Sequence, residues 1–281
     1  MWAASATQSS IRGDAVPSKS GVSRAWNIQP SSDGRRWSAY PAGDKPGSGY
    51  AKVQQSTTLV QPWTPDTTWQ APGNVTLSGV SASNLVITVG GWWDDTHGVG
   101  GTQSLPSSSN GGALSAGVNP TLPNGASTYP THCQIAHFLS PNSGGHTITP
   151  QSLGDSGDGY FFATEFSGPN GTWSLVTSGA AVNESATAGA IDGVTVNTSG
   201  SANAGDLVIA AVLTDGDPTA IGVGAAPGYT ELLATSTTTN NISLGAGWKI
   251  ASSSGVQSAA WTWADNDQKM GAAVIAVYRR S

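Results

Sequence analysis

The sequence contains little charge and a single cysteine. Charged residues make up 10% of the 281 residues. That fraction alone would suit a disordered linker, but a hydrophobic content of 37% with 11 tryptophans supplies more apolar surface for burial than a disordered chain has. With Cys133 as the only cysteine, an internal disulfide is excluded, so the fold must be held by packing and hydrogen bonds.

Long hydrophobic runs are also missing. No apolar stretch approaches the roughly 20 residues that a membrane-spanning helix needs, so we expect no membrane association. The first residues lack both the basic region and the apolar core of a secretory signal peptide, and we expect synthesis in a cytoplasm without export by that route. No sustained apolar period of 3.6 residues is present, which disfavours helices.

What the chain does contain is a β-rich pattern that occurs twice. Short apolar runs are separated by Gly, Pro, Asn and Asp, as expected of antiparallel strands joined by many turns. The landmarks follow one order in both copies, with residues 74–77, 84–89 and 160–166 in the first and 193–196, 206–212 and 272–278 in the second. Leu85 and Leu207 are 122 positions apart, while Val75 and Val194 are 119 apart. A period of this size predicts a duplicated domain and excludes solenoids and propeller blades.

This pattern predicts an all-β protein with two tandem jelly-roll-like antiparallel β-sandwich domains and an extended N-terminal arm. The expected boundaries are residues 1–60 for a basic arm, 61–167 for the first sandwich, 168–192 for a connecting region that can add strands to either domain, and 193–281 for the second sandwich.

The predicted arm differs from the rest of the chain in charge. Residues 1–60 hold seven basic and three acidic side chains, a balance of +4, whereas the remainder carries −10 of the total of −6. Spaced aromatic and basic residues suit an extended peptide that binds a neighbouring protein, for which Trp, Tyr and Arg are the usual anchors. The anchors predicted on this ground are Trp2, Arg24, Trp26, Arg35, Arg36, Trp37 and Tyr40. The alternative is a disordered tail. Nucleic-acid binding is disfavoured because the basic residues are dilute.

Motifs for catalysis are scarce. Glu occurs only at positions 165, 184 and 231, which leaves little for the paired carboxylates of glycoside hydrolysis. A nucleophile elbow, a phosphate-binding loop and a dinucleotide fingerprint are all missing. In the segment from His132 to His137, strand alternation directs the two histidines to opposite faces, so they would not share a metal. We therefore expect no enzyme and no catalytic residues.

Two acidic segments follow the shared apolar strands and give the remaining site candidates. Acidic loops at a sandwich rim can chelate Ca²⁺ through oxygen ligands, and an exposed Trp can stack on a sugar ring. The candidate residues are Trp92, Trp93, Asp94 and Asp95 in the first copy and Asp215 and Asp217 in the second. The structural alternative is that the Asp residues serve turns and the Trp side chains belong to the core. No other cofactor is expected.

Five segments of the C-terminal copy follow one another in a characteristic order. They are Gly205-Asp206-Leu207-Val208-Ile209, Ala226-Pro227-Gly228-Tyr229-Thr230, Gly247-Trp248-Lys249-Ile250-Ala251, Trp261-Thr262-Trp263 and the final strand 271–278. In these segments the copy resembles a β-sandwich module of virion structural proteins from tailed bacteriophages. The resemblance covers about residues 190–280 well and residues 74–167 loosely. Tyr229 stands where Trp is usual in that module, and the first copy lacks a clear counterpart of the Pro227-Gly228 turn.

The resemblance implies a non-enzymatic particle component such as a capsid decoration, fibre or tail accessory protein, located in the virion and anchored to neighbouring subunits by its arm. The partners expected on this basis are other virion proteins and further copies of this chain, without nucleic acid or membrane. The alternative function is a carbohydrate-binding module or adhesin on the particle surface that binds host glycan, with or without Ca²⁺. A polysaccharide-degrading enzyme is a third option.

Overall fold

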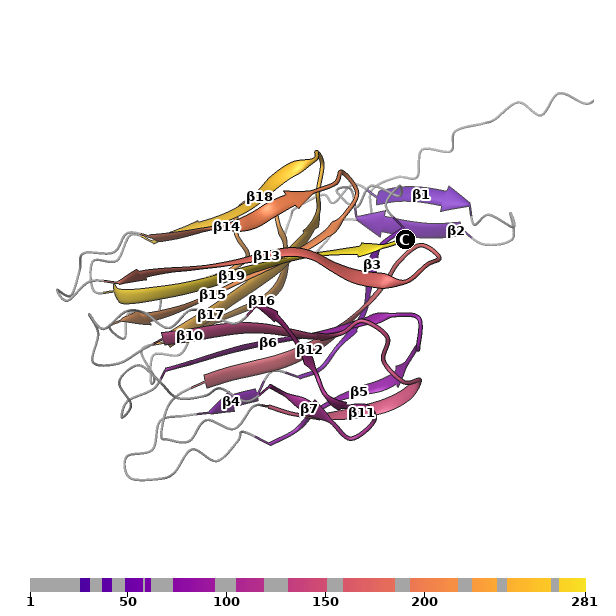
Figure 1. Cartoon of the computed structure of the whole chain (residues 1–281), viewed down its shortest axis with the longest axis horizontal. Coiled ribbons are helices and arrows are strands. Elements are labelled where there is room, and N and C mark those ends of the chain that lie inside the picture. Colours follow the sequence, from indigo (N-terminus) through magenta and orange to yellow (C-terminus); the bar gives the residue numbers. More distant parts are fainter. Residues whose placement is uncertain are drawn as a thin grey trace, which may run out of the picture. The chain divides into compact units, whose positions relative to one another are not determined.

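The protein is built from β-strands arranged in antiparallel sheets, which confirms the predicted fold class (Figure 1). The computed structural model describes residues 26–30, 37–41, 49–57, 59–61, 73–93, 105–118, 131–150, 159–184, 193–216, 224–236, 242–263 and 268–281. Within these ranges no helix has the length and apolar character needed to cross a membrane. The chain divides into two compact units, Met1–Gly47 and Ser48–Ser281.

The first unit contains a β-hairpin where the sequence predicts an extended arm. Strand β1 (Trp26–Pro30) pairs antiparallel with β2 (Trp37–Pro41). In this register Trp26 lies opposite Pro41, and Pro30 lies opposite Trp37. Trp, Ile and Tyr favour strands, so the aromatic residues that suggest an anchor also favour local strand pairing.

The first half of the second unit is a pair of sheets. The larger sheet has the order β3 (Ala51–Gln55), β12 (Gly159–Ser167), β6 (Leu85–Trp93), β10 (Thr131–Phe138) and β9 (Ser115–Val118), and β4 (Leu59–Gln61) also pairs with β12. The smaller sheet has the order β5 (Val75–Val80), β11 (Gly144–Thr149), β7 (Ser107–Ser108) and β8 (Gly112–Ala113). The core between them includes Val75, Leu77, Val86, Ile148 and Phe161.

The second half repeats this plan. Its larger sheet has the order β13 (Trp173–Glu184), β19 (Gln268–Arg280), β15 (Leu207–Gly216), β17 (Ile242–Ile250) and β16 (Thr230–Ser236). Strands β14 (Gly193–Ala202) and β18 (Gly255–Thr262) form the smaller sheet. The core between these sheets includes Val196, Val208, Val212, Ile275 and Val277.

The two halves agree in strand order and in register. The order β3-β12-β6-β10-β9 corresponds strand by strand to β13-β19-β15-β17-β16, and the pair β5-β11 corresponds to β14-β18. Leu85, the first residue of β6, lies opposite Phe166, and Leu207, the first residue of β15, lies opposite Tyr278. The residues that align in the sequence therefore occupy equivalent places in the two sheets.

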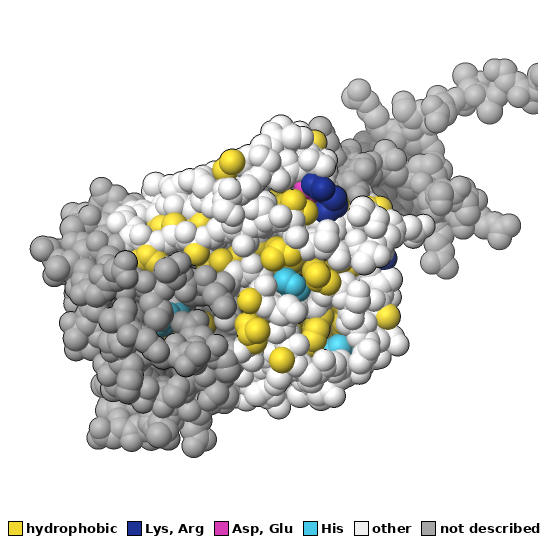
Figure 2. Space-filling view, viewed as in Figure 1, with side chains coloured by type: hydrophobic (Ala, Val, Ile, Leu, Met, Phe, Trp, Pro, Cys, Tyr) yellow, Lys and Arg dark blue, Asp and Glu magenta, His cyan; other side chains and the backbone are white. Residues whose placement is uncertain are grey.

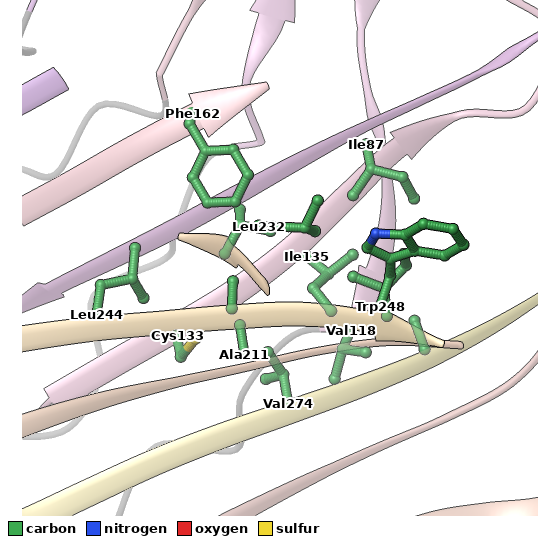
Figure 3. Packing of buried hydrophobic residues seen from close by; sticks show 14 of the residues in the cluster. Ile87, Val118, Cys133, Ile135, Phe162, Ala211, Leu232, Leu244, Trp248 and Val274 are labelled. Atoms are coloured by element: carbon green, nitrogen blue, oxygen red, sulfur yellow. The ribbon is translucent and has the colours of Figure 1, made fainter. Parts of the chain in front are cut away.

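The two larger sheets face each other, so four layers are stacked in the second unit (Figure 1). We call the packed space between the larger sheets the inner interface. Strand β6 contributes Leu85, Ile87 and Val89 to it, and β15 contributes Leu207, Ile209, Ala211 and Leu213. Figure 3 shows further members, including Cys133, Ile135, Phe162, Leu244, Trp248 and Val274. The alternate residues Val208, Ala210 and Val212 face the outer core of the second half. Burial on both faces explains why the central strands are continuously apolar.

An approximate two-fold axis parallel to the strands relates the two halves. Strand β13 contacts β9, and β3 approaches β16, where Gln55 Nε2 donates to the carbonyl of Leu232 at 3.0 Å. Across the inner interface, the edge strand β3 of the first larger sheet thus lies against β16 and the edge strand β9 lies against β13. The equivalent strands of the two sheets therefore follow one another in opposite order. Strands β12 and β19 run in the same direction (Figure 1), and after β12 the carbonyl of Gly168 accepts a hydrogen bond from Arg280 at the end of β19. Because β6 is antiparallel to β12 and β15 is antiparallel to β19, β6 and β15 also run in the same direction.

One boundary differs from the sequence prediction. Strands β3 and β4 pair with β12, although all of their residues but the last, Gln61, were assigned to the arm. Strand β13 lies in the connecting region, which was expected to add strands to either domain, and it pairs with β19. Both β3 and β13 lie at a sheet edge, where one side of the strand has no strand neighbour and the apolar pattern is weak, so the sequence signal is faint.

Candidate functional site

The predicted anchors in the first unit are only partly within the described residues. Trp26 begins β1, and Trp37 and Tyr40 belong to β2, where the backbone is described. Trp2, Arg24, Arg35 and Arg36 lie outside the described residues. The hairpin places Tyr40 opposite Asn27. Attachment through this unit therefore stays a prediction.

The two predicted acidic loops follow strands that end at the same edge of the stack. Strand β6 ends at Trp93 and β15 ends at Gly216, and the two strands run in one direction. Asp215 belongs to β15, with Ile242 and Met270 on either side. Asp94, Asp95 and Asp217 lie outside the described residues, so the Ca²⁺ hypothesis stays a prediction. Among the described residues no group of three or more His, Cys, Asp or Glu side chains could hold a metal ion.

Trp92 does not have the geometry of a sugar platform. Its side chain is 2% exposed, and its ring stacks on His132 with centroids 5.4 Å apart and an interplanar angle of 20°. This agrees with the structural alternative, in which a Trp that leaves a strand belongs to the core. Trp93 closes β6 opposite Thr131.

The histidines of β10 diverge as strand alternation requires. His132 stacks on Trp92, whereas His137 contacts Tyr278 of the opposing sheet. Burial lowers the pKa of each imidazole to about 4, so both are neutral near pH 7. Between them Cys133 is fully buried, and burial raises the pKa of its thiol. The environment of Cys133 is that of a core side chain with little thiolate character.

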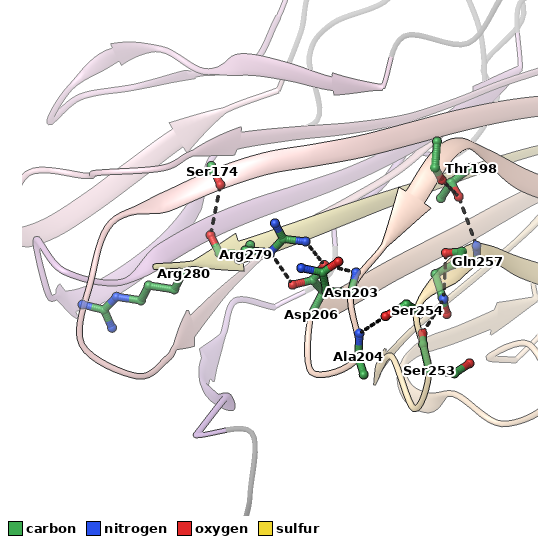
Figure 4. A network of polar contacts seen from close by, with 12 residues as sticks. Ser174, Thr198, Asn203, Ala204, Asp206, Ser253, Ser254, Gln257, Arg279 and Arg280 are labelled. Carbon is green, nitrogen blue, oxygen red and sulfur yellow. Dashed lines mark hydrogen bonds and ion pairs between the residues drawn. The ribbon is translucent and has the colours of Figure 1, made fainter.

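A charged pair fixes the turn that leads into β15 (Figure 4). Arg279 Nε and Nη2 donate to Asp206 Oδ1 and Oδ2, each at 2.8 Å. The Asp206 side chain is 4% exposed and that of Arg279 is 32% exposed. The backbone N–H of Asn203 also donates to Asp206 Oδ2 at 2.7 Å. A bidentate Arg–carboxylate contact with a third donor is a strong, directional arrangement, and hydrogen bonding to Asp206 raises the pKa of Arg279.

The equivalent turn in the first half uses a different acid. Asn84 takes the place of Asp206, and the carboxylate is supplied by Glu165 of β12. Glu165 is 1% exposed and accepts hydrogen bonds from Gln54 Nε2 at 2.6 Å, Asn84 Nδ2 at 2.7 Å and the N–H of Ser81 at 3.0 Å. The carboxylate therefore joins β3, β12 and the turn before β6. In the sequence Glu165 carries no sign of this role, because its partners are 81 to 111 positions away.

Motif residues that carry the phage resemblance serve turns and links between sheets. Gly205 and Gly228 have φ values of 95° and 82°, which favour glycine, and the turn at Gly228 is closed by a hydrogen bond from Tyr229 N to Ala226 O. Tyr229 Oη donates to the carbonyl of Ser258 at 3.0 Å. Lys249 Nζ lies 4.3 Å from the centre of the Tyr229 ring and also donates to Ser258 O, which ties β17 to β18.

The last residues of the chain are bound to the junction between the two halves. Arg280 Nη1 and Nε donate to the carbonyls of Gly168 and Gly171 at 2.7 and 3.0 Å. Its guanidinium lies 5.7 Å from the centre of the Trp173 ring, and its backbone N–H donates to Tyr50 Oη at 2.9 Å. The sequence does not predict this cluster, which assembles residues from positions 50 to 280.

On the described part of the surface in Figure 2, basic and acidic side chains are sparse, and uncharged polar side chains and backbone predominate with apolar atoms between them.

Comparison with protein-family models, with curated proteins and with solved structures found no match to this chain.

Proposed function

We propose that this chain is a non-enzymatic structural component of a tailed-bacteriophage particle, such as a decoration, fibre or tail accessory protein. In this proposal the second unit is the body of the protein, and the first unit attaches it to neighbouring virion subunits. The observation that carries the proposal is the division of the chain into a small basic unit, Met1–Gly47, and a larger compact unit, Ser48–Ser281.

The roles of the resembling residues support this function. Asp206 accepts a hydrogen bond within the turn before β15, and Gly228 adopts the positive φ that its turn requires. Lys249 links β17 of the larger sheet to β18 of the smaller sheet. Each of these residues stabilises a sandwich, and a particle protein needs such a rigid scaffold. The strand orders β3-β12-β6-β10 and β5-β11-β7-β8 support the finer assignment of the first half as a jelly roll, a double-sheet architecture that occurs in viral capsid proteins.

Attachment through the first unit is energetically reasonable. Burial of an aromatic side chain contributes about 1.5 to 3 kcal/mol, whereas an exposed ion pair contributes about 0 to 1 kcal/mol. Trp26 and Trp37 should therefore contribute more to attachment than Arg35 and Arg36, and moderate salt should weaken attachment little.

The test is incorporation of this chain into particles of the phage that encodes it. We expect a Trp26→Ala/Trp37→Ala variant to be depleted from purified particles and an Arg35→Ala/Arg36→Ala variant to be retained in larger part, with immunogold labelling to locate the wild-type protein. Undiminished incorporation of the Trp variant would indicate that attachment runs through the second unit instead. Absence of the wild-type chain from purified particles would refute the virion assignment itself.

A further inference from the structure

Two ring pairs bridge the inner interface. His137 of β10 and Tyr278 of β19 meet edge to face, with ring centroids 5.4 Å apart and an interplanar angle of 83°. Phe166 of β12 and Trp248 of β17 meet in the same manner at 5.6 Å and 65°. Each pair joins one larger sheet to the other.

The two pairs occupy equivalent positions. His137 lies opposite Ile87 and Trp248 lies opposite Ile209, while Ile87 and Ile209 are themselves equivalent, since each is the third residue of its central strand. Phe166 and Tyr278 are equivalent by the register with Leu85 and Leu207, described above. One pair therefore lies on each side of the approximate two-fold axis. The chemistry differs, because the Phe166–Trp248 pair has no group that titrates, whereas the other pair contains an imidazole and a phenol.

The imidazole pair is buried and hydrogen-bonded. His137 is 4% exposed and Tyr278 is fully buried, and His137 Nδ1 lies 3.2 Å from Tyr278 Oη. Burial raises the pKa of Tyr278, so its hydroxyl stays protonated, and it is the donor to Nδ1 in the imidazole tautomer that carries its proton on Nε2. Strand β9 covers the pair closely, since a Cβ at Gly117 would lie 2.7 Å from Tyr278 Oη and 3.2 Å from His137 Nδ1.

The surroundings of His137 offer no described carboxylate to balance a positive charge. Strands β6, β9 and β13, and β15 as far as Thr214, present no titratable side chain among the residues whose side chains are described. On β19 the neighbours of Tyr278 are cationic, with Arg279 bound to Asp206 and Arg280 bound to backbone carbonyls. On β10 the titratable groups are His132 and Cys133, and Glu165 of β12 points to the opposite face of the sheet, toward Ser81.

We propose that the contact between His137 and Tyr278 is an acid-released latch on the inner interface. While His137 is neutral, the latch holds together the side formed by β9, β10, β13 and β19. Protonation leaves the ring with two N–H donors and no acceptor for the Tyr278 hydroxyl, and it places an unbalanced charge among apolar side chains, which is costly. This side of the interface then opens first, because the Phe166–Trp248 side has nothing to protonate. The inference does not depend on the proposed virion function.

The test is hydrogen exchange of the full-length protein by mass spectrometry at pH 7 and at pH 4.5. The variant His137→Gln keeps a neutral acceptor for Tyr278 and cannot titrate. At pH 7 we expect peptides from β9, β10 and β19 to exchange at similar rates in both proteins. At pH 4.5 we expect opening in the wild type to exceed that in the variant by roughly 50-fold, because an imidazole that titrates near 4 when closed and near 6.5 when open favours opening by about that factor. Peptides from β16 and β17 should respond less.

A matched variant carries the latch to the other side. Phe166→Tyr/Trp248→His should make β16 and β17 sensitive to acid as well. Equal exchange of wild type and His137→Gln at pH 4.5, or acid opening that begins at β16 and β17 in the wild type, would overturn the proposal. If His137→Gln does not fold, the imidazole resonances of the wild type decide the question. The His137 signal, identified by its proximity to Tyr278, should titrate near pH 4, and a midpoint near 6.5 would refute the latch.

Discussion

Arg279 and Asp206 form a two-pronged hydrogen-bonded pair that joins the end of the last strand to the turn before the central strand β15. The two residues are 73 positions apart in the sequence, and the contact links the C-terminal end of β19 to the start of the neighbouring strand β15. Because Asp206 also accepts the N–H of Asn203, the carboxylate serves the turn and the sheet together.

Removing the arginine should destabilise the protein more than a surface ion pair would suggest. Arg279→Met leaves a nearly buried carboxylate with only the Asn203 N–H as a described donor, and we expect the free energy of unfolding to fall by about 1.5 to 3 kcal/mol. The measurement is urea denaturation followed by tryptophan fluorescence. Lys52→Met provides the control, because Lys52 is exposed on β3 and should change the free energy by less than about 0.5 kcal/mol. Equal values for the two variants would contradict this role of Arg279.

The buried carboxylate of Glu165 gives a second prediction. Glu165→Gln replaces one acceptor oxygen by an NH₂ group, which then faces either Gln54 Nε2 or the donors of Ser81 and Asn84. We expect the free energy of unfolding to fall by about 1 to 3 kcal/mol. The matched control is Glu231→Gln, since Glu231 is exposed on β16 and should be nearly neutral. Thermal unfolding by circular dichroism would measure both, and a neutral Glu165→Gln would show that the three hydrogen bonds do not depend on the charge.

Truncation separates the first unit from the body of the protein. Deletion of residues 1–47 should leave the far-ultraviolet circular dichroism and the cooperative unfolding of the body intact, because those residues form a separate unit. Deletion of residues 1–61 should lower the unfolding midpoint, since it removes β3, β4 and the Gln54 donor to Glu165. Identical unfolding of the two truncated proteins would show that the two strands do not contribute to the sheet.

Stability should decrease in acid through His132 as well as His137. The pKa of His132 falls from an ordinary 6.5 to about 4 on folding, so the unfolded chain binds the proton more readily. The contribution of neutral His132 to the free energy of unfolding is present in full above pH 6.5 and decreases as the pH falls. It levels off below about pH 4, for a total loss of about 3 kcal/mol. His132→Phe keeps a ring beside Trp92 and removes the titration. Urea denaturation at pH 7.5, 5.5 and 4.5 should therefore give a flatter pH dependence for this variant, and an unchanged dependence would contradict the role of burial.

The strand pattern was predictable because it depends on local periodicity. The apolar alternation of β15 and the turn residues around it mark a strand whatever surrounds it, and the alignment of Leu85 with Leu207 places both at the start of a central strand. The edge strand β3 was not predicted, since a strand with a neighbour on one side needs fewer apolar residues. The burial of Trp92 depends on His132 from another strand, which no spacing in the sequence reveals.

The sequence alone determined the all-β class, the repeated order of strands and the divergence of His132 and His137, because side-chain alternation and turn chemistry act over a few residues. The tertiary structure decided which faces meet. It joined the two larger sheets across the inner interface, brought Glu165 to the turn before β6, and placed His137 against Tyr278. These contacts join residues far apart in the chain, and their energies depend on burial and geometry that exist only after the layers have packed.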